Sequence, residues 1–212
     1  MPTIASDLPS ETPSPARQAL LDAALTLFLQ KGFAASRVDD IALKAGISKG
    51  AVYLHYATKE ALFRGVVEEG VLAQLERAEQ LLVGFNGSAT GLLSTMLHTN
   101  LLEYWGSPSS GIMKLVVAES QQFPGLAEGF YDTITGRARQ LLIDILQLGI
   151  DQGEFRALDV PYTARCILNA LDHELIMAHS LSPEVHSSFD PHRYIDTLLQ
   201  LITGGVSQER KV

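Results

Sequence analysis

Lysine, tyrosine and histidine side chains gather in one stretch of the chain, between Ser36 and Arg64. Its centre reads A-G-I-S-K-G-A-V-Y-L-H-Y, so Lys49, Tyr53 and His55 follow closely on a turn that contains glycine. Ammonium groups and the polar tips of aromatic rings are suited to contacts with phosphate oxygens and base edges. These residue types in this order predict binding of nucleic acid.

The distribution of charge supports the same prediction, although the net charge of −8 argues against it at first. From Lys31 to Arg64 there are six cations and three anions, whereas from Val71 to the end there are nine cations and sixteen anions. A small positive module attached to an acidic body is typical of a compact DNA-binding head. Random scatter of so few charges is the alternative explanation.

Two short helical patterns flank the segment Ala45-Gly46-Ile47-Ser48. A helix-turn-helix needs a short, sharply angled connection of this kind, so that its second helix can enter the major groove. Gly46 permits a left-handed backbone conformation, Ile47 can anchor the turn in the core, and Ser48 is a good N-cap. The stretch therefore predicts a helix-turn-helix whose recognition helix covers about residues 49–55.

Local signals add detail to both helices of this motif. The first helix is expected to have Ser36 as its N-cap, with Asp39 completing an approximate capping box. In the recognition helix, Val52 and Leu54 are expected to be core residues. Gly50 lies in the first turn, where it costs about 1 kcal/mol relative to alanine. That cost makes sense where a bulkier side chain would hold the backbone away from DNA.

Apolar residues at spacings of three and four predict helices along the rest of the chain, and no β-type alternation of useful length appears. The expected helices cover residues 16–31, 58–83, 89–105, 110–122, 125–152, 160–181 and 191–204. The fold class is therefore all-α, with an N-terminal three-helix helix-turn-helix head joined by a long helix to a larger helical body. We divide the chain into a disordered, proline-rich tail at 1–15, a DNA-binding head at 16–62 and a body at 63–212.

Several other classes of protein are not expected. Cys166 is the single cysteine, which rules out an internal disulfide and a multi-cysteine metal site and fits a reducing cytoplasm. No apolar run approaches about 18 residues and the N-terminus lacks the features of a signal peptide, so we expect a cytoplasmic protein without a membrane partner. The sequence holds no G-x-S-x-G motif and no glycine-rich phosphate loop, so no enzyme, cofactor or metal site is expected.

The run G-F-A-A-S-R-V-D-D-I-A-L-K-A-G-I-S-K-G-A-V-Y-L-H-Y-A-T-K-E-A-L-F resembles the DNA-binding segment of the TetR family of bacterial transcriptional regulators, over about residues 16–70. Beyond it, the chain matches that family in length and helical pattern. Carried over to matching positions, the resemblance implies DNA contacts by Ser36, Arg37, Ser48, Lys49, Gly50, Ala51, Tyr53, His55, Tyr56 and Lys59.

Three of these positions have open alternatives. Tyr53 and Tyr56 are also suited to packing, Tyr56 more so, and Lys59 is also interpretable as a solvated charge. Ala51 stands where the family often has threonine, so a hydrogen bond is in doubt there, although its methyl group can touch a thymine methyl.

The resemblance implies that the body senses a ligand and forms a homodimer through its last two helices. The sequence supports this, because the helices near 160–181 and 191–204 are apolar over much of their circumference. Methionine and aromatic residues suit an adaptable apolar pocket. The candidates for ligand binding are Met96, Asn100, Tyr104, Met113, Phe130, His173 and Met177. Each of these residues is also interpretable as an ordinary core residue.

Taken together, these features predict a ligand-responsive transcriptional regulator. The resemblance implies a dimeric repressor that binds a palindromic operator in double-stranded DNA and is released by a small-molecule effector; the residues themselves do not distinguish a repressor from an activator. The alternative is an all-α small-molecule-binding protein with no operator function.

Overall fold

The computed structural model describes residues 14–182, 184 and 188–204, and every regular element within these residues is helical. The predicted all-α class is confirmed. The head contains α1 (Pro15–Lys31), α2 (Val38–Ala45) and α3 (Lys49–His55). Residues 1–13 of the predicted tail lie outside the described residues, and Pro15 already belongs to α1.

A nearly continuous helical rod leads from the head into the body. It consists of α4 (Lys59–Val67), a π-helical turn η1 (Glu68–Leu72) and α5 (Ala73–Gln80). Thr58 begins it as N-cap, because its Oγ1 accepts a hydrogen bond of 3.1 Å from the Ala61 amide. The long connecting helix expected from the sequence is therefore present, with a π-helical turn in its middle.

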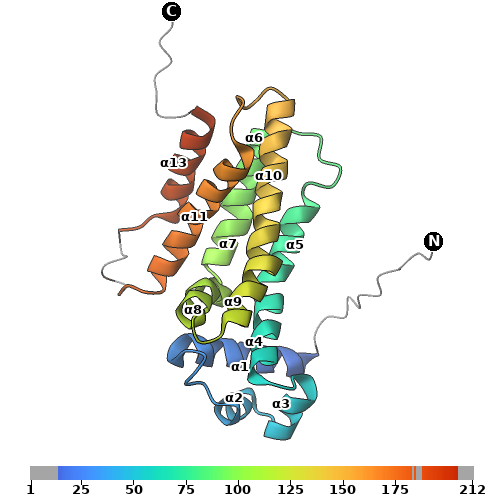
Figure 1. Ribbon diagram of the computed structural model, residues 1–212, viewed down its shortest axis with the longest axis vertical. Helices are drawn as coiled ribbons and strands as arrows, with labels where there is room; N and C mark the ends of the chain where they lie inside the picture. The colour runs from blue at the N-terminus through green and yellow to red at the C-terminus, as the bar shows by residue number, and fades with distance from the viewer. Residues whose placement is uncertain (1–13, 183, 185–187, 205–212) are drawn as a thin grey trace, which may run out of the picture.

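The rest of the body is a bundle of helices. Its elements are α6 (Ala89–Thr95), η2 (Met96–Leu101), α7 (Leu102–Trp105), η3 (Pro108–Gly111), α8 (Ile112–Glu119), α9 (Pro124–Phe130), η4 (Tyr131–Thr135), α10 (Gly136–Asp151), α11 (Val160–Ala178) and α13 (Pro191–Gly204). In Figure 1, α10, α6 and α7 stand upright beside the rod, and α11 and α13 cover one side of them. The helices α8 and α9 lie between this bundle and the head.

Two apolar cores follow one another along the molecule, and their boundary does not lie at residue 62. The first core combines head residues such as Phe28 and Ile41 with Val71 of the rod and with residues of α8 and α9. The second core begins at Leu75 and contains α6, α10 and α11. The division into a head at 16–62 and a body at 63–212 stays a prediction, and the structure shows that head and body share a core across it.

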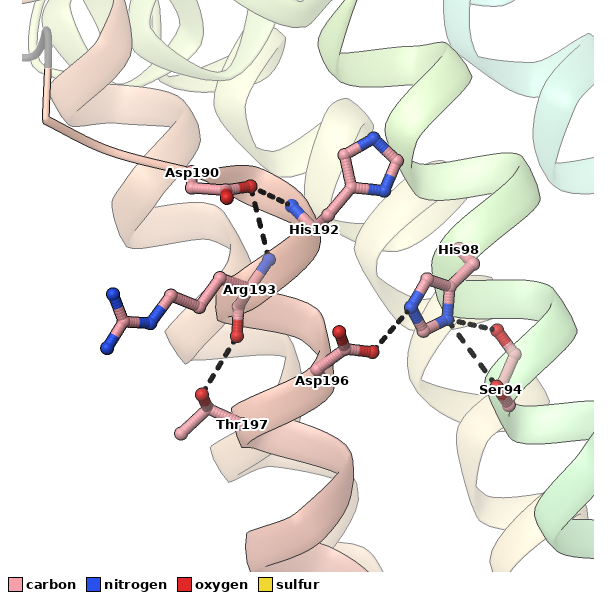
Figure 2. Close-up of polar contacts among 7 residues, drawn as sticks. All are labelled: Ser94, His98, Asp190, His192, Arg193, Asp196 and Thr197. Atoms are coloured by element: carbon pink, nitrogen blue, oxygen red, sulfur yellow. Dashed lines mark hydrogen bonds and ion pairs between the residues drawn. The ribbon is translucent and has the colours of Figure 1, made fainter.

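Polar contacts hold α13 against the bundle (Figure 2). Asp190 caps its first turn, because Asp190 Oδ1 accepts hydrogen bonds from the amides of His192 and Arg193 at 3.0 and 3.2 Å. One turn further on, Asp196 Oδ1 lies 2.9 Å from Nε2 of His98 on η2. The contact between Asp196 and His98 joins α13 to η2 of the bundle, whereas the Asp190 bonds stabilise the first turn of α13 itself. Across the described part of the chain, no helix is long and apolar enough to span a bilayer.

Candidate nucleic-acid interface and body cavity

The turn between α2 and α3 has the geometry that the sequence predicts. Gly46 adopts a left-handed conformation with φ 70° and ψ 25°, and the Ile47 amide donates back to the Ala42 carbonyl at 3.0 Å. Ser48 caps α3, since its Oγ accepts from the Ala51 amide at 3.1 Å. These contacts set the angle at which α3 leaves the turn.

The outer face of α3 is open, at the tip of the molecule farthest from α13 (Figure 1). Lys49, Gly50, Tyr53 and His55 are exposed, while Val52 is buried and anchors the helix. Tyr53 retains 46% of its surface, which favours its availability to DNA over the packing alternative. Ala51 is partly buried beside them.

The prediction that Leu54 belongs to the core is wrong. Its side chain is 88% exposed, because a seven-residue helix packs along one narrow face and Val52 occupies that face. Two residues correspond to about 200° around a helix, so Leu54 points away from the core.

Lys49 already has a partner within the head. Its Nζ lies 2.8 Å from Oδ1 of Asp39 on α2, with both side chains about half exposed. This hydrogen bond raises the pKa of the Lys49 ammonium. A phosphate or base that recruits Lys49 therefore competes with Asp39.

Lys59 is bound to the backbone of the segment between α1 and α2. Its Nζ donates to the carbonyls of Phe33, Ala34 and Ser36 at 2.9, 3.2 and 3.2 Å and lies 4.5 Å from the centre of the Phe33 ring. The three N–H groups of an ammonium match these three acceptors. The solvated-charge alternative is therefore wrong, and the phosphate contact predicted for Lys59 stays a prediction.

Ser36 does not have the role expected from the sequence. Its side chain is buried, and its hydroxyl lies 3.0 Å from the Leu27 carbonyl and 2.7 Å from the Gly32 carbonyl. Arg37 is the N-cap residue of α2 and makes no side-chain capping bond, so the predicted capping box is wrong. The structure also gives no support to a contact between the Ser36 hydroxyl and phosphate, whereas Arg37 is exposed.

Tyr56 packs within the head. A Cβ placed on Gly65 would lie 2.5 Å from Cε1 of Tyr56, so the ring rests directly on the α4 backbone. Its hydroxyl oxygen is buried and the Arg17 guanidinium lies 5.9 Å from the ring centre. The structure thus favours the packing alternative for Tyr56.

One body residue that no sequence pattern indicates reaches into the head. Glu119, at the end of α8, is buried, and its Oε1 accepts hydrogen bonds from the amides of Phe33 and Ala34 at 2.9 and 3.4 Å. Lys59 holds the carbonyls of the same segment. Residues 33–36 are therefore held by an acid of the body and a base of α4, and the sequence shows Glu119 only as one acid in an apolar helix.

A cavity of about 160 Å³ lies inside the body, between the rod and helices α7 to α11. Its wall is mostly aliphatic and aromatic. Among the predicted ligand-binding residues, four line it: Met96, Tyr104, Met113 and Phe130. Ligand binding by these four stays a prediction.

The remaining candidates differ in their positions. His173 is exposed and Met177 is half-buried, and the expectation that they line this cavity is wrong. On α11 the cavity is faced by Leu168, Leu171, Asp172 and Leu175, which share one side of the helix at spacings of three and four. The side chain of Asn100 lies outside the described residues.

The cavity has a polar part that the sequence did not reveal. Burial raises the pKa of the Asp172 carboxyl to about 6. Gln74 on α5 has a buried Oε1 with no hydrogen-bond partner among the described residues. Tyr104 donates its hydroxyl to the Ser109 carbonyl at 3.1 Å, and burial and the charge of Asp172 raise its pKa. Within the described residues, no group of three or more His, Cys, Asp or Glu side chains could hold a metal ion.

Comparison with known proteins agrees with this architecture. Residues 20–66 match the family described as bacterial regulatory proteins, tetR family, and residues 96–197 match the C-terminal domain of AefR-like transcriptional repressors. The transcriptional repressor KstR2 of Mycolicibacterium smegmatis is 30% identical over 167 residues, which cover 77% of this chain and 79% of that protein.

Solved structures share the fold at lower identity. The fatty acid degradation regulator FadR of Bacillus halodurans superposes with a TM-score of 0.73 at 18% identity and covers 94% of this chain and all of its own. FadR of Bacillus subtilis, in complex with stearoyl-CoA, has a TM-score of 0.70 at 20% identity and covers 90% of this chain and 99% of its own. The helix-turn-helix head, the helical body and the KstR2 relationship lead to one conclusion: this chain belongs to the TetR family of DNA-binding transcriptional regulators.

Proposed function

We propose that the protein is a homodimeric repressor that binds a palindromic operator and leaves it when a small molecule occupies the body cavity. The observation that carries this proposal is the position of α8. Met113 on this helix lines the cavity, and Glu119 at its end holds the Phe33 and Ala34 amides of the head. A ligand that shifts α8 therefore acts directly on the segment that joins α1 to α2.

The thermodynamic requirement is that the ligand binds more tightly to a state with displaced heads than to the DNA-binding state. Binding then weakens the operator complex by the same coupling free energy with which the operator weakens ligand binding. Val71 contributes to both the cavity wall and the head core, so the rod provides a second connection.

For the DNA contact we propose the exposed face of the head. Ser48, Gly50 and Ala51 present backbone and small side chains at the start of α3, and Tyr53 and His55 lie further along it. Lys49, Arg37 and Lys59 supply positive charge for phosphate. Gly50 and Ala51 leave the first turn of α3 with few side-chain atoms that could contact bases. We therefore propose that Lys49, Tyr53 and the shape of the DNA groove determine much of the sequence selectivity.

For the dimer we propose the outer faces of α11 and α13. Tyr162 and Leu201 are 67% and 47% exposed on these helices, and Leu181, just beyond α11, is 44% exposed. An isologous interface of this kind matches the two-fold symmetry of a palindromic operator. Leu201→Asp is expected to convert dimer to monomer in light scattering, whereas Leu43→Asp on the exposed head surface is not. A monomeric wild-type chain would refute the dimer.

The test of the regulator itself is binding of the full chain to DNA from upstream of its own gene, measured by fluorescence anisotropy at several salt concentrations. The expected result is affinity that falls steeply with salt, and a slope reduced by about one for Lys49→Ala. Arg156→Ala removes an exposed charge of the body and is the matched control. Salt-independent binding, or equal slopes for the two variants, would overturn the proposal and favour a small-molecule-binding protein with no operator function.

A further inference from the structure

The side chains that line the body cavity indicate which class of ligand it binds. Resting on the proposed function, in which this cavity holds the effector, we propose that the effector is a compact hydrophobic amine whose ammonium group is bound by Asp172. Size, wall chemistry and charge each narrow the class of ligand.

Size limits the apolar part. A cavity of about 150 Å³ lined by aliphatic and aromatic side chains holds benzene, and the cavity here is about 160 Å³. Leu75, Leu141, Leu171 and Phe130 give it a comparable wall. The part of a ligand that fits within this cavity has the bulk of about one ring with a short substituent.

The polar groups of the wall accept hydrogen bonds more than they donate them. The Gln74 Oε1 atom is buried without a donor, and Asp172 offers carboxyl oxygens to which no described residue donates. The Tyr104 hydroxyl proton is already committed to the Ser109 carbonyl. A ligand that supplies N–H donors therefore satisfies groups that the protein leaves unsatisfied.

The charge of the cavity wall favours a cationic ligand. No Lys, Arg or His is among the described residues that line the cavity, and Asp172 is the acid among them. An anion would meet the partly buried carboxylate of Asp172 without a compensating cation, whereas an ammonium would pair with it. Charge-assisted N⁺–H···O⁻ bonds also restore the interactions that the carboxylate loses on burial.

The proposal is tested with four probes that share one aromatic ring bearing one carbon atom and differ in the polar group: benzylamine, benzyl alcohol, toluene and benzoate. Isothermal titration of the full chain without DNA is expected to show benzylamine binding about tenfold or more tightly than benzyl alcohol, since hydrogen bonds to charged groups exceed neutral ones by that margin. Benzoate is expected to bind most weakly. Benzoate or stearoyl-CoA binding as tightly as benzylamine would overturn the proposal.

Two variants test whether the preference for benzylamine depends on the Asp172 side chain. Asp172→Asn is expected to abolish the advantage of benzylamine over benzyl alcohol while toluene still binds, which shows that the cavity is intact. Glu174→Gln removes a carboxylate from the same helix that does not line the cavity, and it is expected to keep the full preference. An unchanged preference in Asp172→Asn, or its loss in Glu174→Gln, would contradict the assignment.

Operator release is measured separately, so the two proposals fail differently. If benzylamine binds through Asp172 but does not affect the operator complex, the ligand class of the cavity stands, and the proposal that an occupied cavity releases the operator is refuted. If an anionic or long-chain compound releases the operator and amines do not bind, the regulatory proposal stands and the ligand assignment is refuted.

Discussion

The head and the body of this protein place their functional groups in opposite ways. In the head, Lys49, Tyr53 and His55 project from one short helix into solvent, within seven residues of one another in the sequence. In the body, the cavity is built by side chains from the rod, α7 and helices α8 to α11, which are far apart in sequence. A surface that reads DNA depends on local order, whereas a cavity depends on how distant helices pack.

The two regions also treat charge differently. Two acids of the head are surface partners of lysines, Asp39 with Lys49 and Asp40 with Lys31. In the body, Glu119 is buried and accepts hydrogen bonds from backbone amides of the head, whereas Asp172 is partly buried in the cavity wall and has no hydrogen-bond donor among the described residues. The satisfied acid connects the two regions, and the unsatisfied acid is the group available to a ligand.

The largest expected effect comes from cutting the connection between the regions. Glu119→Ala removes two charge-assisted hydrogen bonds and leaves the buried Phe33 amide without an acceptor, so the free energy of unfolding is expected to fall by about 3–4 kcal/mol. Chemical denaturation measures this loss. Glu128→Ala, an exposed acid on α9, is the control and is expected to change stability by less than about 0.5 kcal/mol. A similar small change in both variants would mean that head and body are not held together at this point.

The next prediction concerns the unsatisfied acid and its pH dependence. The pKa of Asp172 is about 6 in the folded protein against an ordinary value of 3.8, so the folded state binds the proton more tightly than the unfolded state. Ionising Asp172 in the folded state therefore lowers the free energy of unfolding. This loss is absent below about pH 4, grows as the pH rises through 6, and reaches about 2–3 kcal/mol above it.

The variant Asp172→Asn avoids this cost and is expected to be more stable than the wild type at pH 7.5 and equally stable at pH 3.5. Thermal unfolding of both proteins at the two pH values gives the comparison, with Glu174→Gln as the control for loss of a charge on α11. A destabilised Asp172→Asn at pH 7.5 would show that the carboxylate has a partner that stabilises it.

A smaller effect is expected where the head holds its own lysine. Asp39→Asn frees Lys49 for phosphate and is expected to tighten operator binding by about threefold to tenfold, because the competing ion pair is lost. Asp40→Asn makes the same change of charge but leaves the Lys49 pair in place. Equal gains in the two variants, measured by anisotropy, would attribute the effect to net charge alone.

The smallest prediction tests the turn. Gly46→Ala places a side chain at φ 70° in open space and is expected to cost about 1 kcal/mol, through backbone strain rather than a clash. Gly125→Ala on α9 also meets open space but lies at an ordinary φ. Thermal unfolding is expected to show a loss of stability for Gly46→Ala and no loss for Gly125→Ala, where alanine also favours the helix, and an unchanged stability of Gly46→Ala would remove the reason given for glycine at position 46.

Local patterns determined much of this protein without reference to its tertiary structure. The helix limits near Gly46, Ser48 and Thr58 follow from capping and turn chemistry that acts within a few residues, so the sequence predicted them correctly. The all-α class and the long connecting helix follow from helical periodicity for the same reason. The basic, aromatic order of α3 was equally visible, because its residues are neighbours in the chain.

The tertiary structure decided which side chains are buried, which face solvent and which line the cavity. Ser36 looked like a cap and is buried, Leu54 looked like core and is exposed, and His173 looked like a cavity residue and faces solvent. The hydroxyl of Ser36 turns back to the carbonyls at the end of α1, and the exposure of Leu54 and His173 depends on which face of each helix packs against the rest of the protein, which local periodicity does not determine. The same packing turned Glu119 toward the head and Asp172 toward the cavity, and it gave two acids that look alike in the sequence opposite electrostatic environments.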